Sequence, residues 1–143
     1  MDLTYKEALA YALKLLAGKD YTVCQIEGKL SKRFPSDAVA FVLEYLSSKN
    51  FLNDYRFALN YFQSRMERGW GRRKIRYHLK LKGISEEVIS AVENDVEFDY
   101  SFVEKEIDRK YDLSDRKDRE RAARFLSSRG FTAGEIFNLL ERK

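Results

Sequence analysis

The stretch that decides the fold is RMERGWGRRKIRYHLKLKGI, residues 65–84. Gly69 and Gly71 flank a tryptophan, which allows one helix to end and the next to begin almost at once. Ile75 and Leu79 lie four residues apart, so both face the core from one side of the second helix. The stretch therefore predicts two helices joined by a tight turn.

The pattern of this stretch recurs along the chain at a nearly constant spacing. Similar segments open at Tyr5, Tyr55 and Tyr100, 50 and then 45 residues apart, and a leucine-led segment follows each after 24 to 26 residues. Coincidences in register indicate internal repeats, each of which is one supersecondary unit. We predict three tandem repeats, with the limits 1–52, 53–95 and 96–143.

Each repeat is predicted to hold three helices. Apolar residues keep the spacing of one helix face, no segment alternates with a period of two, and the only proline is Pro35. The predicted helices span residues 4–18, 22–34, 36–49, 54–68, 72–82, 86–95, 99–111, 115–129 and 133–142. A repeat of about 45 residues has a small core, so stacked repeats are more stable than single ones. The predicted fold is all-α, with about nine helices in an elongated, curved array.

Capping residues mark the predicted helix ends. Capping boxes are predicted at Thr4 with Glu7, Thr22 with Gln25 and Thr132 with Glu135. Simple N-caps are predicted at Ser36 and Ser85, and helix stops at Gly69, Gly83 and Gly130. Gly28 lies inside a predicted helix, where it costs about 1 kcal/mol relative to alanine. Close helix packing is one explanation for this glycine.

Composition limits the class of protein. The 143 residues are 44% hydrophobic and 14% aromatic, which is typical of a folded chain. A single cysteine, Cys24, excludes an internal disulfide framework, and a single histidine, His78, leaves no Cys/His cluster for structural zinc. The sequence contains neither an apolar segment long enough to span a membrane nor a secretion signal. We expect a soluble, cytoplasmic protein with no metal and no cofactor.

Positive charge gathers in the middle of the chain. The net charge is only +4, but residues 65–82 hold eight cations and one anion, Glu67. Such an excess predicts an acidic partner, and a solvated helix face is the alternative. The predicted binding residues are Arg65, Arg68, Trp70, Arg72, Arg73, Lys74, Arg76, Lys80 and Lys82. Trp70 either covers the small core, which is the favoured interpretation, or stays partly exposed as a stacking or interface residue.

Three of these cations form a stripe along one helix. Because two apolar residues of the helix face the core, Arg72, Arg76 and Lys80 point outward at positions i, i+4 and i+8. Replacing Arg72, Arg73 and Arg76 by glutamate is therefore expected to abolish binding and to leave folding intact.

The first turn of the same helix runs against local preference. Arg72, Arg73 and Lys74 lie where the helix dipole favours anions, and no acidic residue is next to them in sequence. Three cations and free backbone N–H groups predict a site for a phosphate or a carboxylate. The structural alternative is that Asp118 or Glu120 compensates the three charges.

The sequence contains no catalytic constellation. There is no phosphate-binding glycine loop that ends in Lys-Ser or Lys-Thr, and no Gly-x-Ser-x-Gly motif. His78 has cationic neighbours and no paired carboxylate, serine or cysteine beside it. We predict that the protein is not an enzyme.

Two segments carry a longer pattern of residue types: FLNDYRFA at residues 51–58, followed by spaced glycines and apolar residues, and RFLSSRGF at residues 124–131. Its motif residues are Asp54, Phe57, Ala58, Tyr61, Gly69, Gly71, Ile75, Leu79, Gly83, Ile84, Arg129, Gly130 and Phe131. The pattern resembles the central and third repeats of the bacterial regulatory protein RecX family. Where that family often has a proline and an acidic residue, this chain has Arg72 and His78, and both departures make the helix more basic.

The resemblance implies a modulator of the RecA recombinase. Such proteins lie in the groove of the RecA–single-stranded-DNA filament and inhibit ATP hydrolysis, strand exchange and cleavage of the damage-response repressor. The implied roles are in recombination, DNA repair and the SOS response. The implied partners are the RecA filament and single-stranded DNA, with weaker contact to double-stranded DNA and none to a membrane, and the expected state is a monomer.

Two other functions fit the residues. A direct DNA-binding module is the first alternative, because three-helix units with a basic helix are similar to helix-turn-helix modules. A helical adaptor for another acidic protein is the second. Steeply salt-dependent binding to bare DNA favours the first alternative, whereas binding only in the presence of the filament favours a RecA modulator.

Overall fold

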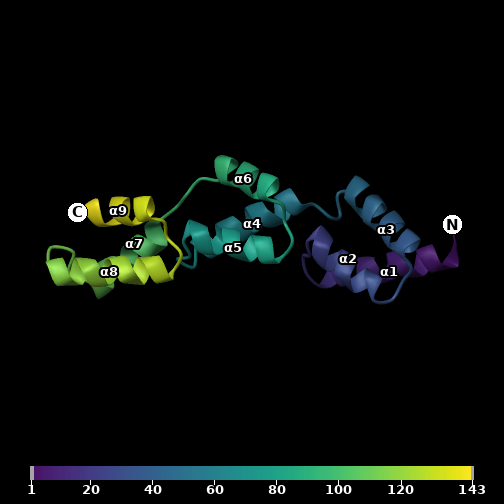
Figure 1. Ribbon diagram of the computed structural model, residues 1–143, viewed down its shortest axis with the longest axis horizontal. Helices are drawn as coiled ribbons and strands as arrows, with labels where there is room; N and C mark the ends of the chain where they lie inside the picture. Colours follow the sequence, from purple (N-terminus) through teal and green to yellow (C-terminus); the bar gives the residue numbers. More distant parts are fainter. Residues whose placement is uncertain (1, 143) are drawn as a thin grey trace. The chain divides into compact units, whose positions relative to one another are not determined.

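The computed structural model describes residues 2–142, and all regular structure in that range is helical (Figure 1). The helices of the described chain are α1 (Leu3–Gly18), α2 (Val23–Ser31), α3 (Ser36–Ser48), α4 (Asp54–Met66), α5 (Arg72–Leu81), α6 (Glu86–Asp95), α7 (Ser101–Lys110), α8 (Arg116–Ser128) and α9 (Ala133–Glu141). The predicted all-α class, built from helical repeats, is confirmed. Among the described helices, none combines the length and the apolar character that crossing a bilayer requires.

The chain forms two compact units. The first unit runs through Ala58 and adds Leu79–Val92, and the second takes Leu59–His78 and the described chain from Glu93 onward. Neither unit corresponds to one predicted repeat, and the predicted repeat limits themselves stay predictions.

The core of the first unit lies where α1 and α2 pack against α3. Ala8 and Ala12 of α1 are fully buried, and their small side chains let the neighbouring helices approach closely. Leu30 and Val42 bring larger side chains from α2 and α3. α2 ends at Ser31, three residues earlier than predicted. Phe34 precedes Pro35, and the residue before a proline disfavours helical backbone, so the helix cannot continue to its predicted end at Phe34.

In the second unit, α8 packs against α9 over a core that also includes α7. Ile107 and Leu126 are fully buried, and Phe131 contributes a large ring from the turn between α8 and α9. Ile75 of this unit and Leu79 of the first unit, the two predicted core positions of α5, are both 0% exposed. The periodicity of the basic helix therefore identified its inner face correctly.

The predicted capping boxes are confirmed at two helices and wrong at a third. Thr22 and Thr132 cap α2 and α9 through reciprocal bonds with the third helical residue. At α1 the cap is Asp2, whose carboxylate accepts from the Thr4 N–H at 2.8 Å. Asp2 lies earlier in the chain and offers a better acceptor, so the helix begins before Thr4.

Of the two predicted simple N-caps, Ser85 is confirmed and Ser36 is wrong. Ser85 caps α6 as predicted, because its Oγ accepts from the Val88 N–H at 3.2 Å. Ser36 is instead the first residue of α3, and Pro35 takes the cap position without a side-chain bond. The three glycine stops are confirmed by positive φ values of 82° at Gly69, 86° at Gly83 and 90° at Gly130.

Candidate partner-binding site

The candidate site lies where α4 ends and α5 begins, in the second unit. We call Arg65, Arg68, Trp70 and Lys74 the Trp70 cluster. The glycine turn after α4 reverses the chain within a few residues, with Gly69 in the left-handed conformation. This turn brings the end of one helix and the start of the next around the same tryptophan ring.

Cation–aromatic contacts hold Arg65 and Lys74 of the Trp70 cluster against aromatic rings, and Arg68 is the exposed third cation. The Lys74 Nζ lies 4.2 Å from the centroid of the Trp70 ring. The Arg65 guanidinium lies 5.3 Å from the same ring and 4.4 Å from the Tyr61 ring. The His78 ring lies 5.0 Å from Trp70. Trp70 itself is half-buried, so it covers the apolar interior and also supports the cations above it.

The cations of the Trp70 cluster are not neutralised by any carboxylate that the structure describes. Arg65, Arg68 and Lys74 form no ion pair with any residue that the structure describes. The Arg65 Nη1 donates to the Ser64 Oγ at 3.1 Å, and its Nε has no hydrogen-bond partner within residues 2–142. Cations held on aromatic rings without a carboxylate produce a local positive potential that suits an acidic partner.

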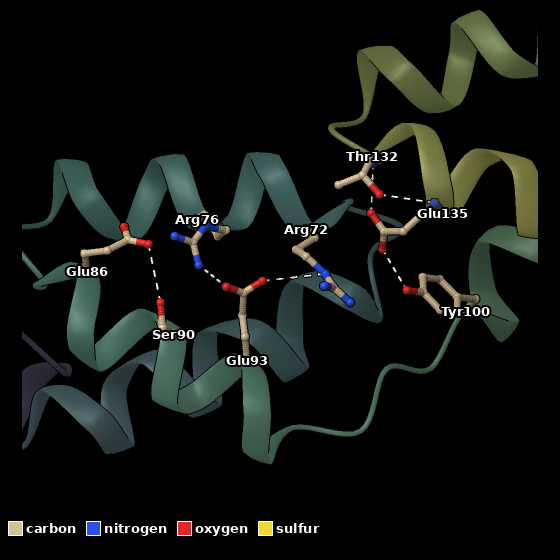
Figure 2. Close-up of polar contacts among 8 residues, drawn as sticks. All are labelled: Arg72, Arg76, Glu86, Ser90, Glu93, Tyr100, Thr132 and Glu135. Atoms are coloured by element: carbon tan, nitrogen blue, oxygen red, sulfur yellow. Dashed lines mark hydrogen bonds and ion pairs between the residues drawn. The ribbon is translucent and has the colours of Figure 1, made fainter.

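The predicted outward stripe on α5 is arranged differently. Arg72 and Arg76 turn toward α6, where Glu93 accepts from Arg76 and lies 3.6 Å from the Arg72 Nε (Figure 2). Glu93 is 14% and Arg76 21% exposed, so this pair is largely withdrawn from solvent, whereas Arg72 is 36% exposed. Lys80, in the first unit, pairs with Glu86 at 2.9 Å in an exposed contact. The stripe is therefore lined by carboxylates of α6.

Asp118 and Glu120, the carboxylates proposed from the sequence to compensate the cations at the start of α5, do not pair with them. Asp118 pairs with Arg121 and Glu120 with Arg116, both within α8. Glu93 takes the compensating role instead. It lies on α6, the helix that follows α5 in the chain. The sequence alone does not indicate which carboxylate will pair with a given cation.

Arg73 forms hydrogen bonds with backbone carbonyl groups at the end of α8. Its guanidinium donates to the backbone oxygens of Phe131 at 3.1 Å and Ser127 at 3.4 Å. Its own N–H donates to the Gly130 oxygen at 2.9 Å. The predicted free N–H for an anion is therefore wrong at this residue. A cation that is unfavourable at the start of α5 is favourable at the end of α8, where the carbonyl groups point outward.

Two motif glycines make this contact possible. A Cβ at Gly71 would lie 2.2 Å from the Phe131 nitrogen, and a Cβ at Gly130 would lie 2.4 Å from the Lys74 Cβ. The Gly71 N–H also donates to the Arg129 oxygen at 2.8 Å. The structure therefore brings the motif residues of the α4–α5 turn and of the α8–α9 turn together, as backbone packed on backbone.

Two motif residues of the first unit, Asp54 and Gly83, make contacts that hold α2 in place. The Asp54 carboxylate accepts from the Val23 N–H at 2.9 Å, at the start of α2. The Lys82 carbonyl accepts from the Thr22 hydroxyl at 2.6 Å. A Cβ at Gly83 would lie 2.3 Å from the Cys24 Cβ, so α2 packs directly on the end of α5.

The other motif residues have similar roles. Ala58 and Ile84 are buried in the first unit, Phe57 is half-buried, and Tyr61 is 8% exposed in the second. Arg129 pairs with Glu106 at 3.2 Å and lies 4.5 Å from the Phe125 ring. The resemblance thus rests largely on residues that build the fold.

A half-buried tyrosine paired with a buried carboxylate was not predicted from the sequence. The Tyr100 hydroxyl donates to Glu135 at 2.7 Å, and Glu135 is 8% exposed (Figure 2). Burial and the hydrogen bond to Glu135 raise the pKa of Tyr100 to about 12, although nearby Arg72 acts in the opposite direction. The capping box at Thr132 was the available signal, because it places Glu135 at the start of α9. The capping box uses only the Oε1 atom of Glu135, and the sequence does not indicate that Oε2 binds Tyr100.

The described part of the chain holds no group of three or more His, Cys, Asp or Glu side chains arranged for a metal ion. The fold and the site define an all-helical repeat protein with a cation–aromatic surface suited to an acidic partner.

The chain belongs to the RecX family. The family model for the second three-helix domain of RecX matches residues 53–92, and the model for the first three-helix domain matches residues 8–46. A regulatory protein RecX of Thermus thermophilus is 36% identical over 128 residues, which cover 90% of this chain and 86% of the relative. The regulatory protein RecX of Chromohalobacter salexigens is 35% identical over 129 residues, 87% of this chain and 85% of the relative.

Solved structures agree on the fold. A crystal structure of RecX from Lactobacillus salivarius matches with a TM-score of 0.82 at 18% identity, over 97% of this chain and 96% of that chain. A crystal structure of regulatory protein RecX matches with a TM-score of 0.78 at 20% identity, over 98% of this chain and 74% of that chain.

Proposed function

We propose that this chain regulates the RecA recombinase in the bacterial cytoplasm. It binds the RecA–single-stranded-DNA filament as a monomer and inhibits ATP hydrolysis, strand exchange and repressor cleavage. It thereby modulates recombination, DNA repair and the SOS response. Membership of a family of regulatory proteins supports the proposal. The observation that carries it is the Trp70 cluster, whose cations lack carboxylate partners among the described residues.

The local ion pairs narrow the proposed contact surface. Arg72 and Arg76 are held by Glu93, and using them for a partner requires breaking a largely desolvated pair, which is costly. Lys74 and Arg68 carry no such cost. The proposed contact with acidic protein groups or phosphates in the filament groove therefore centres on these two residues.

Single-stranded-DNA-dependent ATP hydrolysis by the RecA of the same organism tests the proposal. We expect the wild-type chain to inhibit hydrolysis at concentrations below those that coat the DNA. The double variant Arg68→Gln with Lys74→Gln should need a concentration roughly tenfold higher, the equivalent of about 1.4 kcal/mol. Two exposed charge contacts at about 0.2–1 kcal/mol each give a loss of this size.

The matched control removes the same charge elsewhere in the second unit. Arg109 and Lys117 are exposed and have no ion pair within the described chain. The double variant Arg109→Gln with Lys117→Gln should inhibit like the wild type. Equal loss in both variants would show that net charge alone matters. No inhibition by the wild type, combined with tight and salt-sensitive binding to bare DNA, would instead identify a DNA-binding module.

A further inference from the structure

A cleft of about 370 Å³ opens in the first unit, beside α2 and the turn that precedes it. The lining residues that matter here are Lys19, Tyr21, Gln25, Gly28, Lys29 and Lys32. We call this site the lysine cleft. It belongs to a different unit from the Trp70 cluster and contains none of the residues that the sequence analysis proposed for binding.

The lysine cleft is positively charged and has no internal compensation. Lys19, Lys29 and Lys32 form no ion pair with any described residue, including Asp20 and Glu27, their acidic neighbours in sequence. Two of the ammonium groups lie over one aromatic ring: the Nζ atoms of Lys19 and Lys29 are 4.9 and 5.6 Å from the centroid of the Tyr21 ring. The lysine heads are thereby gathered around one ring.

Gln25 adds a polar donor to the same cleft. Its Oε1 accepts from the Thr22 N–H at 2.9 Å, as part of the capping box. The Nε2 group has no hydrogen-bond partner among the described residues, and it offers only donors. The polar groups that line the cleft thus favour an anion.

Gly28 is the second, independent observation. Its backbone is ordinary helix, and a Cβ at this position would meet nothing within 4 Å. The close helix packing considered for this glycine is therefore wrong. A glycine that costs a helix about 1 kcal/mol, and that neither conformation nor packing requires, fits a place where a ligand approaches the backbone.

We propose that the lysine cleft binds a phosphate of a nucleic acid backbone. The charged groups of this cleft are all lysines, which bind phosphate as point charges, and a polyanionic backbone can meet several of them at once. Lysines lie over the Tyr21 ring, which leaves no role for base stacking. The contact is therefore independent of sequence and does not require a recombinase.

Binding of an oligothymidylate to the full chain, followed by fluorescence anisotropy over a series of salt concentrations, tests the site. The triple variant Lys19→Gln, Lys29→Gln, Lys32→Gln should bind at least tenfold more weakly at low salt. Its plot of log affinity against log salt should be less steep by about 2, because each lost phosphate contact on a single strand removes about 0.7.

Three other lysines of the first unit provide the matched control. Lys6, Lys14 and Lys49 are also exposed but do not line the cleft, and Lys49 likewise lies over a tyrosine ring, at 5.9 Å from the Tyr45 centroid. The variant Lys6→Gln, Lys14→Gln, Lys49→Gln should keep the wild-type slope. An equal loss in both triple variants would overturn the proposal, since it would reflect net charge.

Gly28→Leu tests the shape of the cleft without removing a charge. Leucine is a better helix former than glycine, and the space above Gly28 is open, so the variant should be at least as stable as the wild type. Its side chain fills the cleft, and DNA binding should weaken about as much as in the lysine variant. Unchanged DNA binding by a folded Gly28→Leu protein would overturn the assignment to the cleft.

Inorganic phosphate separates two sources of the ligand. We expect phosphate to compete weakly with the oligothymidylate in the wild type. If phosphate shifts the amide resonance of Gly28 while all variants bind DNA equally, the cleft serves a small phosphate compound and the nucleic acid proposal is overturned. None of these readouts depends on RecA, so their failure is distinct from a failure to inhibit ATP hydrolysis.

Discussion

Glu93 shows how much one residue decides about the charge of α5. It pairs with Arg72 and Arg76, and its side chain is 14% exposed. Removing one member of a desolvated cluster leaves the others uncompensated, which is strongly destabilising. The structure therefore changes the expectation for glutamates at Arg72, Arg73 and Arg76: three carboxylates facing Glu93 and the end of α8 would weaken the fold as well as binding.

The glycine at position 71 leads to a prediction about stability. Gly71→Ala should lower the free energy of unfolding by about 2–4 kcal/mol, because the new Cβ would meet the backbone of Gly130 and Phe131 at 2.2–2.5 Å. Urea denaturation measures the change. Gly134→Ala is the control, since a Cβ there meets nothing within 4 Å and should be neutral or stabilising. Equal stability of the two variants would refute the close contact.

Tyr100 leads to a prediction about pH. Its pKa is about 12 in the folded protein and about 10 in an unfolded chain, so the folded state holds the proton more tightly. The resulting stabilisation is complete below pH 10 and is lost as the pH rises from about 10 to about 12. Phenylalanine does not ionise, so the stability advantage of the wild type over Tyr100→Phe should shrink across that window in urea denaturation. A constant difference would contradict the pKa.

At the scale of elements, the capping boxes of α2 and α9 are the same local motif in different surroundings. Both were predicted from their spacing, and both form. Thr22, however, is fully buried and also donates to the Lys82 carbonyl at 2.6 Å, whereas Thr132 is half-buried and only caps its helix. The local sequence pattern therefore locates the start of a helix. How much the capping residue contributes to the free energy of unfolding depends on its tertiary contacts.

This difference predicts unequal costs for the same substitution. Thr132→Ala should lower the free energy of unfolding by about 1 kcal/mol, the usual value of a cap. Thr22→Ala should cost about 2–3 kcal/mol, because it also leaves a buried carbonyl without its donor. Thermal or urea unfolding of the two variants gives the comparison. If Thr22→Ala were no costlier than Thr132→Ala, the bond to Lys82 would add nothing.

At the scale of the whole molecule, apolar periodicity was sufficient for the fold class. Positions such as Ile75 and Leu79 are buried as their spacing indicates, and each described helix falls within a few residues of a predicted one. The largest difference is at α2, which ends at Ser31 although the prediction extended it to Phe34, the residue that Pro35 restricts.

The charged surface was harder to predict than the core. Eight cations in one short stretch indicated an acidic partner, but α6 supplies carboxylates to three of them, and Arg73 binds the end of α8. The lysine cleft draws Lys19 from the turn before α2, Lys29 from α2 and Lys32 from the residue that follows α2. Its only sequence signal was the unexplained Gly28.

The sequence by itself determined the helices, the inner face of each, most of their ends and the family, because these depend on residue type and on spacing within about one turn. Only the tertiary structure decided which cations of α5 pair with a carboxylate, since Arg72 and Arg76 meet Glu93 from a different helix, α6. Arg72 and Lys74 show this difference. They lie two residues apart in one helix, yet Glu93 holds the first, while the second rests on Trp70 with no carboxylate partner among the described residues.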